Sequence, residues 1–72
     1  MTQFHRYQAG EYLIKRGGLP IGRITRVRTG WARGDWLIDA DHGRTLKSQW
    51  DRRQSTYAGT LACAKIIATT IS

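Results

Sequence analysis

The chain has 72 residues, with twelve lysine and arginine side chains against five aspartate and glutamate side chains, and a formal net charge of +7 at pH 7. This length supports one domain with a modest core, and an enzyme is disfavoured because a substrate pocket is hard to enclose in so little protein. The single cysteine excludes an internal disulfide, and no apolar run approaches the roughly 20 residues that a transmembrane helix needs. We therefore expect a single cytoplasmic domain over residues 1–72, not an enzyme, with no cofactor and no membrane partner.

The amino-terminal part of the chain predicts one strand. Residues 1–9 show no clear period, which leaves two interpretations open: a loose segment, or a segment whose Phe4 and Tyr7 fold back onto the core. Residues 11–16 are rich in aromatic and aliphatic side chains and have the composition and spacing typical of a first strand. Gly17-Gly18 then favours a turn.

Two further strands are predicted in the middle of the chain. Residues 21–29 predict the second strand, but no single register buries all of its aliphatic residues. We therefore expect a β-bulge near Gly22 or Thr25, because the extra residue would move the following side chains to the opposite face of the sheet. Residues 30–35 have the composition of a hairpin connection, and residues 36–40 predict the third strand.

A long amphipathic helix over residues 49–70 is the clearest predicted element. Its apolar residues recur at steps of three, four or seven and form one stripe: Trp50, Tyr57, Leu61, Ala64, Ala68 and Ile71. Ser48 and Asp51 match the capping box, in which side chains satisfy free amide groups at a helix start. Residues 45–47 are either a short fourth strand or the lead into this helix. The predicted fold class is α+β: a three-stranded antiparallel sheet within residues 11–47, packed against one C-terminal helix, with its other face open to solvent.

The basic residues are concentrated in the predicted sheet. Residues 12–34 contain six basic side chains and no acidic one. Alternation places Arg26 and Arg28 on the same strand face, about 7 Å apart, close to the spacing of phosphates along a nucleic-acid strand. Most of the basic residues are arginine, which grips phosphate or guanine in two places. The open face is therefore the predicted nucleic-acid interface, formed by Lys15, Arg16, Arg23, Arg26, Arg28, Trp31 and Arg33. The alternative interpretation is a solvated strand face that arginine keeps soluble.

The other candidate residues receive mostly structural interpretations. Trp36 and Trp50 are expected to fill the core, whereas Trp31 suits the core and stacking on an exposed base equally well. Asp39 and Asp41 share a strand face, as the carboxylates of a metal-dependent nuclease would, but no third carboxylate stands at a convincing spacing. We therefore expect no catalytic residue and no metal site.

The order of three strands and a helix, with the run from Gly22 to Trp31 followed by Trp36-Leu37-Ile38, resembles two related groups of DNA-binding domains. These are the amino-terminal arm-site-binding domains of integrases and the plant ethylene-response domain, which read the DNA major groove with a three-stranded sheet backed by a helix. The resemblance implies that DNA is contacted by Arg23, Arg26, Arg28 and Trp31. Asp39 and Asp41 depart from the pattern, because a third reading strand would prefer basic residues there.

A second resemblance concerns the turn after the third strand. Gly30-Trp31 followed by Asp39-Ala40-Asp41-His42-Gly43-Arg44 and a terminal helix is similar to small accessory proteins of actinobacterial phages. For such a protein the expected location is the cytoplasm of the host. This resemblance implies where the protein would act but does not indicate how it would act.

Together these patterns predict non-enzymatic binding of nucleic acid, DNA rather than RNA, through a basic sheet face. The alternative is a small phage-type module or inhibitor that engages a host protein through the same arginine and tryptophan face, because both residue types are common at interface hot spots. The expected oligomeric state is a monomer or a weak homodimer.

Overall fold

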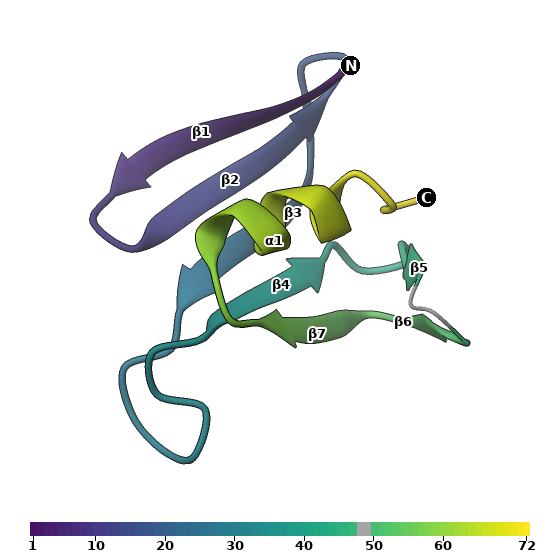
Figure 1. Cartoon of the computed structure of the whole chain (residues 1–72). Helices are drawn as coiled ribbons and strands as arrows, with labels where there is room; N and C mark the ends of the chain where they lie inside the picture. Colours follow the sequence, from purple (N-terminus) through teal and green to yellow (C-terminus); the bar gives the residue numbers. More distant parts are fainter. Residues whose placement is uncertain (48–49) are drawn as a thin grey trace.

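The computed structural model describes residues 1–47 and 50–72, which form a five-stranded sheet, a separate two-stranded sheet and one helix (Figure 1). The α+β class is therefore confirmed, but the main sheet has five strands in the order β1-β2-β3-β4-β7, not the three that were predicted. All pairings are antiparallel. In chain order the elements are β1 (Thr2–Gln8), β2 (Glu11–Arg16), β3 (Leu19–Arg26), β4 (Trp36–Ala40), β5 (Leu46–Lys47), β6 (Arg52–Arg53), β7 (Ser55–Ala58) and α1 (Leu61–Ala68).

The two additional strands of the main sheet are its edges. Residues 2–8 form β1 and pair with β2, so the amino-terminal segment is not loose, and Phe4 packs against the core. Residues 55–58 form β7 and pair with β4 at the opposite edge. β1 pairs with the strand that follows it directly, whereas the partner of β7 lies farther back in the chain, where local periodicity does not reveal it.

The helix is shorter than the predicted 49–70, because it begins only at Leu61. The hydroxyl of Thr60 accepts a hydrogen bond from the Cys63 amide at 3.1 Å, which satisfies one of the free donors of the first turn. Before this cap, the Ser-Thr-Tyr run of β7 contains residue types that suit a pleated strand better than a helix. Ser48 of the predicted capping box lies outside the described residues.

One face of the main sheet is covered by α1, as Figure 1 shows. Residues that are paired across strands share a face, and one row runs across all five strands through Arg6, Tyr12, Ile24, Ile38 and Thr56. Ile24 and Ile38 in the middle of this row are fully buried. We call this side the helix face and the opposite side the open face.

The predicted bulge in the second strand is present. The register of β2 with β3 shifts between Ile14 and Lys15, whose partners are Gly22 and Pro20, so that Ile21 is the extra residue. Ile21 and Gly22 are both buried as a result. The bulge brings Ile21 into the same core as Ile24, which a regular strand would not do.

The core lies between the helix face and α1. The helix contributes the small residues Ala64 and Ala68, and Ile71 follows it into the same cluster. Gly22 of β3 lies where Ile71 approaches the sheet: a Cβ atom added there would stand 3.0 Å from the Ile71 Cδ1 atom. Small side chains on both layers therefore let the helix lie close to the sheet.

Candidate nucleic-acid interface

The open face, where the binding residues were expected, carries balanced charge. Among its strand residues, Lys15 and Arg23 are matched by Glu11 and Asp39. Arg23 and Asp39 stand directly opposite each other on β3 and β4. The predicted concentration of arginines on this face is therefore wrong, and the open face has no net charge to attract a polyanion.

The reason is that β3 ends before the alternation can continue. Arg26, its last residue, pairs with Trp36 on the helix face. The chain then leaves the sheet, so Arg28 belongs to the β3–β4 connection and does not share a strand face with Arg26. The Arg26 amide donates to the Gly10 carbonyl at 2.8 Å, and the Arg28 guanidinium donates to the Ala9 carbonyl at 3.1 Å. These two bonds join the end of β3 and the connection that follows it to the turn between β1 and β2.

Three of the predicted arginines, together with Arg6, instead gather around a hollow at one end of the helix face. The β1–β2 turn, the β3–β4 connection and the first residue of α1 meet there, at the left of Figure 1. The hollow has a volume of about 820 Å³. Its lining residues are Arg6, Ala9, Gly10, Tyr12, Arg26, Val27, Arg28, Arg33, Gly34, Trp36 and Leu61. We call it the arginine hollow.

Two aromatic rings lie deeper in the arginine hollow than the guanidinium groups. Tyr12 and Trp36 are half-buried, whereas all four arginines are exposed. The two rings meet edge to face, with their centroids 6.1 Å apart. The Arg26 guanidinium lies 5.5 Å from the centre of the Trp36 ring, and the Lys65 ammonium lies 5.4 Å from that of Tyr12. Positive charge is thus held against aromatic surface, as in cation–π pairs.

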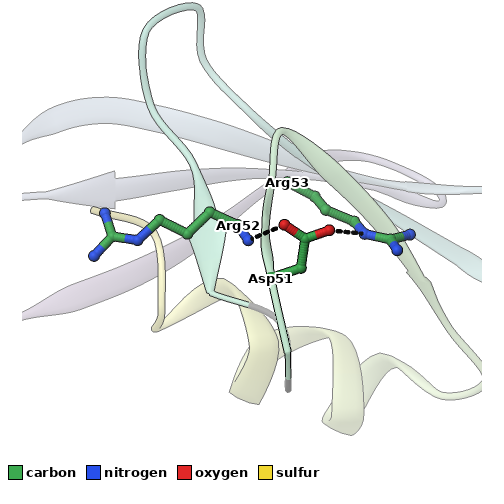
Figure 2. Close-up of polar contacts among 3 residues, drawn as sticks. All are labelled: Asp51, Arg52 and Arg53. Atoms are coloured by element: carbon green, nitrogen blue, oxygen red, sulfur yellow. Dashed lines mark hydrogen bonds and ion pairs between the residues drawn. The ribbon is translucent and has the colours of Figure 1, made fainter.

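Within the described residues, the arginines of the hollow form no ion pair with a carboxylate. None of its lining residues is acidic. Within residues 1–47 and 50–72, the one ion pair joins Arg53 to Asp51 at 3.4 Å, and neither residue lines the hollow (Figure 2). Figure 2 also shows the Arg52 amide donating to Asp51, at 2.7 Å. The arginine hollow is therefore a concave, cationic and partly aromatic surface.

The predicted binding residues are divided among four places. Arg26, Arg28 and Arg33 line the arginine hollow, and Lys15 and Arg23 lie on the open face. Arg16 lies beside the segment that follows α1, and Trp31 lies in the β3–β4 connection. Trp31 is 87% exposed and meets Tyr57 of the edge strand, with ring centroids 5.3 Å apart. The sequence interpretation missed Arg6, Tyr12 and Trp36 as lining residues. Arg6 reaches the hollow because a hairpin through Gly10 pairs it with Tyr12, a pairing that residues 1–9 do not signal by themselves.

The other candidate residues have simpler positions. Trp36 packs against the core as expected, but Trp50 is 88% exposed, so its predicted core position is wrong. Its place in the stripe depended on a helix that does not extend that far. Asp39 lies on β4 and Asp41 just beyond it, and in the described residues no three His, Cys, Asp or Glu side chains gather as a metal site would require.

Arg16 has a structural role at the other end of the helix face. Its guanidinium donates to the carbonyls of Thr69 and Ile71, beyond the last turn of α1, and to the Thr2 hydroxyl at 3.2 Å. A cation suits these carbonyls because the end of a helix carries partial negative charge. Arg16 thereby connects β1, β2 and the segment after the helix.

Replacing Arg16 with alanine should lower the free energy of unfolding by about 1–3 kcal/mol, because several carbonyl and hydroxyl groups lose a charged donor. Urea unfolding followed by circular dichroism measures the change. Arg23→Ala is the matched control, since Arg23 is exposed on the open face. This substitution should lower the free energy of unfolding by no more than about 0.5 kcal/mol. Equal effects of the two substitutions would contradict the structural role of Arg16.

Comparison with known proteins adds nothing to this description: no family model, no curated protein and no solved structure matches the chain. Within the described residues, no helix is long and apolar enough to cross a membrane. Function has therefore to be inferred from the chemistry of the arginine hollow itself.

Proposed function

We propose that this protein binds nucleic acid, without catalysing a reaction, through the arginine hollow. The observation that carries the proposal is the gathering of four arginines and two half-buried aromatic rings around one hollow with no acidic lining residue. Guanidinium groups grip phosphates with paired donors, and aromatic rings stack on bases. A net charge of +7 would further attract a polyanion over distance.

The proposed mode differs from the one that the integrase-type resemblance implies. That mode needs Arg23, Arg26, Arg28 and Trp31 to act together from one sheet face. In this structure Arg23 lies on the open face, Arg26 on the helix face, and the other two in the connection between β3 and β4. We retain DNA over RNA as the expected ligand, and matched DNA and RNA probes test that choice.

A salt titration of binding tests the proposal. If the four arginines of the hollow each contact a phosphate, the logarithm of affinity should fall with the logarithm of salt at a slope of about −3 on a single strand or −4 on a duplex. Fluorescence anisotropy of labelled probes measures this slope. Affinity that does not depend on salt, or no binding at low salt, would contradict the proposal.

The decisive variant is Arg6→Ala with Arg33→Ala. Both side chains are exposed, and neither makes a side-chain hydrogen bond within the described residues, so the fold should survive. Binding should weaken, and the magnitude of the salt slope should fall by about half, because two of the four phosphate contacts are lost.

The matched control removes the same charge elsewhere. Arg23→Ala with Arg52→Ala leaves the net charge equal to that of the first variant but alters the open face and β6. The salt slope should stay close to that of the unaltered protein. If both double variants lose the same affinity and slope, binding depends on overall charge and not on the arginine hollow.

A second candidate function is protein binding, favoured by the exposed pair of Trp31 and Tyr57. A tryptophan that is 87% exposed is a typical anchor at an interface. Affinity capture before and after nuclease treatment separates the two functions. A partner that is retained after nuclease, and lost in Trp31→Ala, would establish the second function.

A further inference from the structure

We propose that the arginine hollow accepts an unpaired nucleotide, so that the protein prefers single-stranded nucleic acid to duplex. The base would lie against Tyr12 and Trp36, and the adjoining phosphates would bind the surrounding arginines. This inference rests on the proposed function and specifies the form of nucleic acid that the same site recognises.

The first argument is the depth at which the two kinds of side chain lie. The rings of Tyr12 and Trp36 are half-buried, and Leu61 at the start of α1 lines the same hollow, whereas the guanidinium groups are exposed. In a duplex the bases are stacked and paired inside, and the phosphates are outside. A duplex laid across the hollow would therefore reach the arginines but leave the rings without a partner, whereas an unstacked base can enter.

The second argument is size. Sites for small molecules and cofactors have volumes of about 300–1,000 Å³, and the arginine hollow falls within this range at about 820 Å³. A site that only gripped a phosphate backbone would need a track of charge along the surface and no hollow lined with apolar groups. Val27, Leu61 and the two rings supply such a lining.

The third argument is the existing contact of a cation with each ring. Arg26 lies over Trp36, and Lys65 lies over Tyr12 and Phe4. A base that enters the hollow can stack on a ring or on the guanidinium plane of Arg26, since both surfaces favour stacking with a π system. The same arginine can then contact the phosphate of that nucleotide.

Intrinsic fluorescence can show whether a base reaches Trp36. Trp31→Phe with Trp50→Phe leaves Trp36 as the single tryptophan, and both replaced residues are almost fully exposed, so the fold should be retained. The probes are oligothymidylate, oligouridylate and a blunt-ended DNA duplex of equal length. Either single strand should quench Trp36, and the duplex at equal occupancy, followed by anisotropy, should not.

Replacement of the ring separates stacking from charge. Trp36→Leu should lower affinity for oligothymidylate by about 5- to 150-fold, the range found when one stacking partner is removed. The salt slope should not change, because no phosphate contact is lost. Trp36→Phe should retain most of the affinity. Thermal unfolding checks that each variant is folded; if Trp36→Leu is not, Tyr12→Leu provides the same comparison from β2.

The outcomes distinguish this inference from the proposed function. Tighter binding of single strands, with quenching of Trp36, supports both. Duplex binding that equals or exceeds single-strand binding, with Trp36 unquenched, overturns the inference and leaves the proposed function standing. Absence of binding to all three probes at low salt overturns both.

Discussion

Gly22→Ala should lower the free energy of unfolding by about 3 kcal/mol or more, a large share of what a small domain possesses. A Cβ atom at this position would stand 2.7 Å from the carbonyl oxygen of Asp39 and 3.0 Å from the Cδ1 atom of Ile71. The first obstacle is the backbone of the adjacent strand β4, which cannot retreat without breaking its pairing with β3. Urea unfolding followed by circular dichroism gives the change.

Gly59→Ala is the matched control for this prediction. Gly59 precedes the helix cap, does not have a positive φ angle, and has open space within 4 Å of the position that a Cβ atom would take. Alanine there should change stability by no more than about 1 kcal/mol, in the stabilising direction, because the unfolded chain loses freedom. Similar losses for Gly22→Ala and Gly59→Ala would refute the steric explanation.

Ile24→Ala should cost about 2–5 kcal/mol, and Ile24→Val about 0.5–1.5 kcal/mol. Ile24 lies on the central strand of the main sheet, is fully buried, and has Tyr12 and Ile38 as its partners on either side. Removing its side chain leaves a cavity that the surrounding strands cannot close, since each is paired on both sides or packed against the helix. Denaturant midpoints of the three proteins measure the series.

Ile66→Ala provides the comparison for the same chemical change outside the core. Ile66 is on α1 but is 69% exposed, so truncation removes little buried surface, and the cost should be within about 0.5 kcal/mol. If the helix were instead pressed against the sheet through Ile66, its truncation would cost as much as that of Ile24.

The strands of the middle of the chain were predictable because their signals are local. Residues 11–16 and 36–40 form strands at the predicted boundaries. A bulge near Gly22 or Thr25 was predicted because no single register buries all the aliphatic residues of that strand, and it lies at the first of these two positions. The start of the helix was not predictable in this way. Trp50 and Tyr57 are seven residues apart, which satisfies a helical period, but Tyr57 lies in a strand that pairs with β4 and the helix begins only at Leu61.

The candidate site was only partly predictable for the same reason. The residue types were informative, and three of the seven predicted residues line the arginine hollow: Arg26, Arg28 and Arg33. Their face was wrong, because a strand was extended past Arg26, whereas β3 ends at that residue and Arg28 belongs to the connection that follows. Arg6 joins the site through the pairing of β1 with β2, which no local pattern in residues 1–9 indicated.

The distribution of roles among the arginines has a consequence for how this protein can change. Arg6 and Arg33 contribute charge to the hollow but make no side-chain hydrogen bond within the described residues, while the isoleucines and alanines that hold the layers together lie elsewhere. If the hollow binds nucleic acid as proposed, selection can adjust ligand preference at those two positions with little penalty in folding. Arg28 is different, because its side chain also bonds to the Ala9 carbonyl and so contributes to the fold; it should be the slowest of the hollow's arginines to diverge.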